Sequence, residues 1–143
     1  MSRRTLASVL SSGLVVVLAL LSAGCEGGMA GEPPGAASAA SQRFPDVVKV
    51  AVRGEGGAYD FEVTVSSPYD TPERYADGWR IVAPDGTTLG TRPLAHDHAA
   101  EQPFTRSLEG IPVAEGISRV TVQARDLVNG YGGATVTVRL PDR

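Results

Sequence analysis

Both histidines of the chain lie in one short segment, His96-Asp97-His98, and Glu101 follows three residues later. Zinc and copper accept imidazole nitrogens, and a His-x-His pair can offer two of them to one ion where the chain bends. A third ligand would have to come from Asp97, Glu101 or a distant loop. The segment raises a metal-binding hypothesis for His96, His98 and Glu101. The simpler interpretation, which we favour, is that they are solvated loop residues or that one caps a neighbouring carbonyl.

Other combinations of reactive side chains are few. The chain has no Gly-x-Ser-x-Gly elbow, no His-Glu-x-x-His pattern and no spaced carboxylate pair that would predict a catalytic cleft. Asp126, Asp97 and Glu101 could cluster, although acidic residues at loop ends are common at solvent. The glycine-rich segment 129–133 would need a following helix to hold phosphate, and no helix is predicted there. We therefore expect a protein that is not an enzyme, with a hydrolase as the least favoured function.

The segment 101–106 has a structural interpretation. We expect Phe104 to enter the core and Arg106 to pair with a carboxylate on the sheet face. Gln102 should satisfy backbone groups beside Pro103.

Between residues 48 and 140, period-two alternation of apolar and polar residues predicts a series of strands. The expected strands span residues 48–52, 59–65, 79–83, 88–94, 104–108, 119–125 and 134–140. A glycine-rich turn at 54–57 should make a hairpin of the first two, and Pro-Asp-Gly-Thr at 84–87 should close the third. Pro93 cannot donate a ladder hydrogen bond, so the fourth strand should lie at a sheet edge. Tyr59, Phe61 and Trp79 are expected in the core.

Seven short strands with turns between them indicate an all-β protein, a seven-stranded antiparallel β-sandwich over residues 46–143. Trp79 on the third strand and the hairpin 120–136 resemble the immunoglobulin and fibronectin type III class of bacterial surface domains, over roughly residues 46–140. The resemblance implies an immunoglobulin-like fold. The paired cysteines of antibody domains are absent, so stability must come from apolar burial.

Strands that run up and down alternate their connections between the two ends of a sandwich. Connections 54–58, 84–87 and 110–117 should meet at one end, and the longer 67–77, 95–103 and 126–133 at the other. The longer loops carry the candidate binding residues Tyr69, Tyr75, His98, Asn129 and Tyr131. Long loops with aromatic and ionisable groups on a rigid scaffold commonly bind partners. The start of the first strand should lie at this same end.

The lone cysteine, Cys25, ends an apolar leader that begins with Arg3 and Arg4. A basic start, an apolar stretch and small residues form the pattern of an export signal. Residues 21–25, Leu-Ser-Ala-Gly-Cys, resemble the lipobox of bacterial lipoprotein signal peptides, which implies cleavage of residues 1–24 and lipidation of Cys25. The twin-arginine export motif is a weaker resemblance at residues 2–6. An uncleaved membrane helix is the alternative, and its serines argue against it.

Residues 25–45 are rich in Gly, Ala, Ser and Pro, which predicts a flexible linker after the lipid anchor. Without residues 1–24 the side chains carry a net charge of about −5, which argues against a nucleic-acid partner.

These observations favour a lipid-anchored protein of the bacterial cell envelope, facing the periplasm or the cell exterior. Its partners would be the membrane, through the anchor, and a protein or glycan bound non-catalytically by loops 67–77, 95–103 and 126–133. The alternative is an envelope metal-binding lipoprotein that uses His96 and His98 for zinc or copper. No other cofactor is expected.

Overall fold

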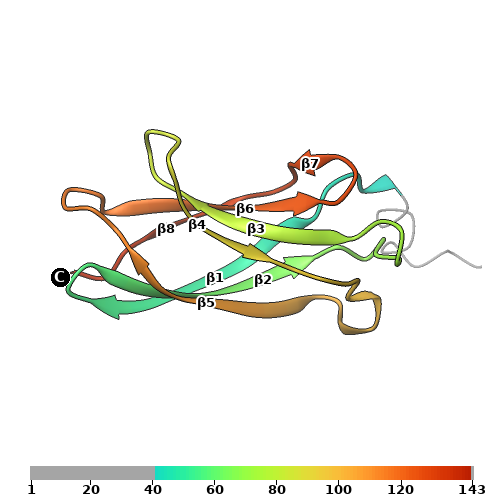
Figure 1. The fold of residues 1–143 in the computed structure, drawn as a ribbon, viewed down its shortest axis with the longest axis horizontal. Helices are drawn as coiled ribbons and strands as arrows, with labels where there is room; N and C mark the ends of the chain where they lie inside the picture. Colours follow the sequence, from blue (N-terminus) through green and yellow to red (C-terminus); the bar gives the residue numbers. More distant parts are fainter. Residues whose placement is uncertain (1–40, 143) are drawn as a thin grey trace, which may run out of the picture. The chain divides into compact units, whose positions relative to one another are not determined.

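The structure, a computed structural model, describes residues 41–142. These residues form two antiparallel sheets that face each other (Figure 1), with one three-residue 3-10 helix, η1 (Ala99–Glu101). The prediction of an all-β protein is confirmed. Within the described part, no helix has the length and apolar character needed to cross a membrane.

The first sheet has three strands in the order β1-β2-β5, and the second has the order β4-β3-β6, with β7 and β8 both paired to β6. The strands of the first sheet are β1 (Asp46–Glu55), β2 (Ala58–Ser66) and β5 (Phe104–Pro112). Those of the second are β3 (Ala76–Val82), β4 (Thr88–Pro93), β6 (Arg119–Asp126), β7 (Gly130–Tyr131) and β8 (Val136–Arg139). β4, which contains Pro93, lies at a sheet edge as predicted.

The described residues form eight strands, so the prediction of seven is not confirmed. The additional strand is β7, whose two residues pair with Arg125 and Asp126 of β6. Two residues are too few for an alternation pattern, and the glycines around them favoured the prediction of a loop over residues 126–133.

The first strand also differs from its prediction. A bulge between Val47 and Lys49 changes the register with β2. Val47 is buried, whereas Val48 is 51% exposed. A bulge places two residues opposite one and reverses which face the following side chains occupy, so simple alternation fails here.

The core lies between the sheets and contains the expected aromatic residues. Trp79, Tyr59, Phe61 and Phe104 are each at most 2% exposed. They pack with the inward valines of β2 and β6, including Val63, Val65, Val120 and Val122. The prediction for Phe104 is confirmed, and apolar burial supplies the main stabilising term of the described domain.

The predicted turns have the required backbone. Gly56 and Gly57 both have positive φ between Glu55 and Ala58, as a two-residue hairpin turn demands. At 84–87, Gly86 has positive φ and its N–H donates to the Ala83 carbonyl, while the Asp85 carboxylate accepts from the Thr87 N–H.

Residues 42–45, which the sequence places in the linker, contact the sandwich. Pro45 is buried, and Gln42 donates to the Ser66 carbonyl at 3.2 Å. Phe44 lies so close to Gly132 that any side chain there would meet its ring. A Gly/Ala/Ser/Pro composition hides these contacts, because they depend on a few residues near the end of the segment.

Candidate functional site

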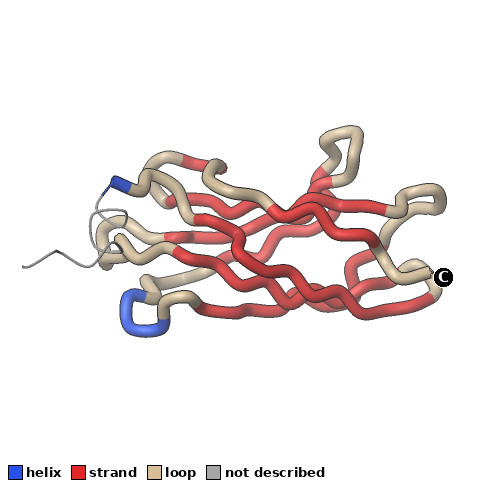
Figure 2. Tube along the Cα trace, turned by 180° about the vertical axis from the view of Figure 1, so that it is seen from behind, coloured by secondary structure: helices blue, strands red, loops and turns tan. Residues whose placement is uncertain are grey.

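The connections 67–77, 95–103 and 126–133 lie at one end of the sandwich, which we call the loop end (Figure 1). Hydrogen bonds join the three. The Leu127 N–H donates to the Tyr75 carbonyl at 2.9 Å, and the His98 N–H donates to Asp70 at 3.1 Å. The turns at 56–57, 84–87 and 113–118 lie at the other end (Figure 2). The alternation of connections expected from the sequence is therefore observed.

Asp126, at the end of β6, organises one of these loops. Its carboxylate is fully buried and accepts hydrogen bonds from the backbone N–H groups of Val128 and Asn129, at 3.0 and 2.7 Å. The Asn129 side chain and the Tyr69 hydroxyl each donate at 2.8 Å, and Arg74 Nε lies at 3.2 Å. Burial alone would raise the pKa of Asp126. The hydrogen bonds from Asn129, Tyr69 and Val128 outweigh burial and lower it.

Tyr69 and Arg74 extend this network toward the start of the described chain. The Arg74 guanidinium lies 4.2 Å above the Tyr69 ring and donates to the Arg43 carbonyl at 2.8 Å. Asn129 donates to the same carbonyl at 3.3 Å. Burial, and next the hydrogen bond to Asp126, raise the pKa of Tyr69 above its usual range. Tyr69 and Asn129, both predicted to bind a partner, are thus used to fix the loops and the entering segment.

Asp70 joins the first two loops. One carboxylate oxygen accepts from the Ala76 N–H and the other from the His98 N–H, both at 3.1 Å. Gln102 adds a second link, since it accepts from the Ser67 N–H at 2.7 Å and donates to the His98 carbonyl at 3.2 Å. The prediction that Gln102 satisfies backbone groups is confirmed. The roles of Asp70 and Asp126 were missed, although Asp-x-x-Asn-Gly at 126–130 is a recognisable pattern for a carboxylate that caps following N–H groups.

The candidate metal ligands are brought together only in part. The His98 ring is 2% exposed and lies between Phe104 and His96, with ring centroids 4.0 and 4.7 Å away. Its Nδ1 is buried and has no hydrogen-bond partner among the described residues. Burial, followed by Arg106 and His96, lowers the pKa of His98. These features keep His98 neutral at neutral pH.

Glu101 points to Arg106, whose guanidinium donates to both carboxylate oxygens at 3.0 and 3.2 Å. This hydrogen bonding lowers the pKa of Glu101. Arg106 was expected to pair with a carboxylate on the sheet face, and its partner instead comes from η1. Within residues 41–142, no group of three or more His, Cys, Asp or Glu side chains is arranged to hold a metal ion. Asp97, Glu101 and Asp126 do not form one cluster.

The two remaining predicted tyrosines have different surroundings. The Tyr75 hydroxyl lies 3.5 Å from the Ala95 carbonyl in the neighbouring loop. Tyr131 is half-buried on β7, and the Arg80 guanidinium covers its ring at 3.8 Å. One face of the Tyr131 ring is therefore covered, and Tyr75 is partly buried.

The exposed side chains of the loop end include two large apolar residues. Leu127 and Val128 are 41% and 67% exposed, and they are two of the three large hydrophobic residues exposed in the described part. His96 is also exposed. Leu127 and Val128 sit directly after Asp126, whose hydrogen bonds fix their backbone. The loop end therefore presents an apolar pair on a hydrogen-bonded backbone, with exposed polar residues in the neighbouring loops.

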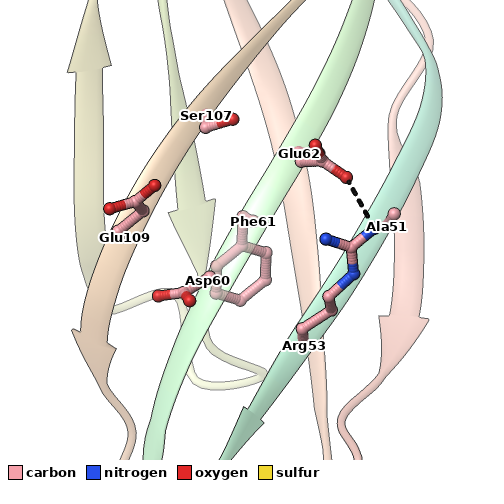
Figure 3. Close-up of a pocket in the computed structure, with 7 residues that line it drawn as sticks. All are labelled: Ala51, Arg53, Asp60, Phe61, Glu62, Ser107 and Glu109. Atoms are coloured by element: carbon pink, nitrogen blue, oxygen red, sulfur yellow. Dashed lines mark ion pairs between the residues drawn. The ribbon is translucent and has the colours of Figure 1, made fainter.

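A shallow depression of about 90 Å³ lies on the outer face of the first sheet (Figure 3). Two of its three carboxylates have partners: Glu62 pairs with Arg53 at 3.3 Å, and Asp60 accepts from the Gly110 N–H at 2.7 Å. The remaining polar residues along it are Ser107 and Glu109. We assign no chemistry to this depression.

Cys25, the predicted lipidation site, and the leader 1–24 lie outside the described residues.

Comparisons with known proteins give little further information. No family model and no curated protein matches the chain. A superoxide reductase from Giardia intestinalis is similar in structure, with 16% sequence identity and a TM-score of 0.39. The alignment covers 66% of this chain and 99% of the reductase.

Proposed function

We propose that this protein is a lipid-anchored cell-envelope protein whose β domain is a non-catalytic interaction module that binds a protein or glycan through the loop end. In this proposal the domain is an immunoglobulin-like sandwich of the fibronectin type III class. The strand orders β1-β2-β5 and β4-β3-β6-β8 support this, because the fourth strand pairs with the third and extends the second sheet.

The observation that carries the proposal is the exposure of Leu127 and Val128 on a loop with a fixed backbone. Ordering a flexible loop on binding costs conformational entropy, and a loop already held by Asp126 avoids that cost. Contiguous exposed apolar groups rimmed by polar residues are characteristic of interaction sites, and Leu127 and Val128 are adjacent. The described chain begins at this same end, where Arg43 and Phe44 contact the loops.

The test replaces Leu127 and Val128 together by serine in the full chain. Capture of a partner from the native envelope extract should fall at least about tenfold, as expected when an apolar contact is removed from an interface. The matched control is Val48→Ser, which changes the third exposed large apolar residue and leaves the three loops intact. Equal capture by the double variant and the parent chain would refute the loop assignment.

The lipid anchor is a separate part of the proposal and rests on the leader and Cys25. Two or three acyl chains on one cysteine would hold the protein on a membrane far more firmly than one chain. Radiolabelled palmitate should mark the parent chain and not Cys25→Ala. Absence of label on the parent chain would refute lipidation without affecting the loop assignment.

The second candidate function is zinc or copper binding by His96 and His98. The observation that favours it is the Nδ1 of His98, which has no hydrogen-bond partner within residues 41–142 and whose ring lies beside the exposed His96. A third donor would have to come from Asp97 or another loop, because the Glu101 carboxylate forms an ion pair with Arg106. Metal analysis of the purified protein at micromolar free ion decides it, with His96→Ala as the variant that should lose any bound metal.

A further inference from the structure

The outer face of the second sheet has a charge that its sequence does not reveal. Along β6, Val120, Val122 and Ala124 face the core, so Arg119, Thr121, Gln123 and Arg125 face outward. Arg139 and Thr137 of β8 lie opposite Arg119 and Thr121, and Arg80 of β3 lies opposite Gln123. Four arginines therefore share this surface, which we call the basic face: Arg80, Arg119, Arg125 and Arg139.

Few carboxylates offset this charge. Asp77 pairs with Arg125, and Asp142 lies 3.8 Å from Arg139 in a pair whose side chains are 96% and 73% exposed. Such an exposed pair contributes little. Among the described residues, neither Arg80 nor Arg119 is in an ion pair. A chain that is acidic overall thus concentrates positive charge on one sheet surface.

The arrangement of Arg119 and Arg139 is costly for the sheet itself. Directly opposed residues in an antiparallel pair lie about 5 Å apart at Cα, and like charges in that position destabilise the sheet. A depression of about 160 Å³ lies beside them, lined by Pro84, Thr121 and Thr137 among others. Two arginines at opposed positions beside a hollow in the surface supply two guanidinium groups, each of which can donate paired hydrogen bonds to an anion.

The groups between the arginines are hydrogen-bonding side chains and one aromatic ring, Tyr131, which lies 3.8 Å from the Arg80 guanidinium and 6.0 Å from that of Arg125. The Thr121 and Thr137 hydroxyls lie 2.8 Å apart, and Gln123 accepts from Arg80. The exposed large hydrophobic residues of the described part, Val48, Leu127 and Val128, are not on these strand positions. The exposed large aliphatic residues that would anchor a protein partner lie elsewhere on the described domain. Hydroxyl, amide and guanidinium groups on a flat sheet, with one aromatic ring among them, fit a polyhydroxylated anion.

We propose that the basic face binds an acidic polysaccharide, with Arg119 and Arg139 holding one carboxylate-bearing sugar and Arg80 and Arg125 extending the contact along the chain. Positions 119 and 125 are about 20 Å apart along β6, which spans several sugar units of an extended chain. This surface is separate from the loop end and does not depend on the lipid anchor.

The experiment uses the full chain in detergent and measures its retardation by polygalacturonate in affinity electrophoresis at low salt. The parent chain should be retarded by polygalacturonate, and added salt should weaken the interaction. Neutral dextran should have no effect. Arg119→Ala with Arg139→Ala should weaken the affinity at least about tenfold, because two charge-assisted contacts are removed.

The matched control is Lys49→Ala with Arg53→Ala. It removes the same charge from β1, in the other sheet, and should leave the affinity within about twofold of the parent if position and not net charge matters. Equal loss in both double variants would refute the basic face as the site, as would absence of retardation of the parent chain. Equal retardation by poly-glutamate would refute an acidic polysaccharide as the specific ligand.

Discussion

At the scale of single residues, Asp126 is the side chain on which the loop end depends most. Its buried carboxylate accepts five hydrogen bonds, including those from Tyr69 and Arg74. Asp126→Asn removes the negative charge and replaces one accepting oxygen by an NH2 group, which would face hydrogen-bond donors instead of acceptors. We expect a loss of about 3 kcal/mol in the free energy of unfolding at pH 7. Urea denaturation measures it, with Glu109→Gln as an exposed control.

The pKa of Asp126 gives this prediction a pH dependence. Because the folded-state pKa lies below the ordinary value of 3.8, the carboxylate stabilises the fold above about pH 4. That contribution is lost as the pH falls through the folded-state pKa. Asp126→Asn should therefore lose less stability than the parent chain on acidification below pH 4. Parallel plots of unfolding free energy against pH for the two proteins would contradict a lowered pKa for Asp126.

A second prediction concerns His98 and the stability of the fold in a higher pH range. Its folded-state pKa is lowered, so the neutral ring is favoured in the fold and stability is fully present above pH 6.5. Stability should fall as the pH drops below that value, by at most about 1.4 kcal/mol per pH unit. The groups facing the ring are His96, Phe104, Arg106, Glu101 and Asp70.

His98→Phe should remove this dependence while keeping a ring stacked on Phe104. Thermal unfolding at pH 7.5 and 5.5 measures the effect. The parent chain should lose more stability than the variant between these values, and equal losses would show that His98 does not titrate in this range.

At the scale of elements, the alternation of apolar and polar residues was enough to place seven of the strands. It succeeded best where one face of a strand is buried, as in β2 and β6. It failed at Val48, where a bulge breaks the period, and at β7, which is too short to have one. The connections that meet at the loop end followed from strand parity. The burial of a loop side chain such as His98 depends on contacts between distant segments. It could not be predicted from the local sequence pattern.

The contact between β4 and β5 yields a prediction of its own. These edge strands belong to different sheets, and a Cβ at Gly90 of β4 would lie 2.8 Å from Ile111 and 3.3 Å from Leu108. Gly90→Val should therefore overpack this seam and cost about 2 kcal/mol of stability. Thr91→Val is the control, since Thr91 is exposed on the opposite face of β4 and should change stability little. Chemical denaturation of the two variants compares them, and equal stability would mean that the sheets can separate at this edge.

At the scale of the whole molecule, the described domain includes its entry segment. Gln42, Phe44 and Pro45 contact the strands and the loop end, so they stabilise the fold as well as connecting it to the preceding residues. The same contacts couple the two roles that we propose for the protein, because the segment leading from the anchor is bound to the loops expected to meet a partner. A change in this segment should affect both stability and binding.

Two truncated chains and one replacement test this coupling. Removal of residues 1–40 should leave a β-type circular dichroism spectrum and cooperative unfolding, because residues 41–142 contain both sheets and the core between them. Removal of residues 1–45 should cost about 3 kcal/mol, through the loss of buried Pro45, the Phe44 contact and the hydrogen bonds to Arg74. Replacement of 42–45 by Gly-Ser repeats keeps the chain length and should cost nearly as much. If that replacement were as stable as the chain starting at residue 41, the entry segment would be a plain tether and the loops would be held by Asp126 and Asp70 alone.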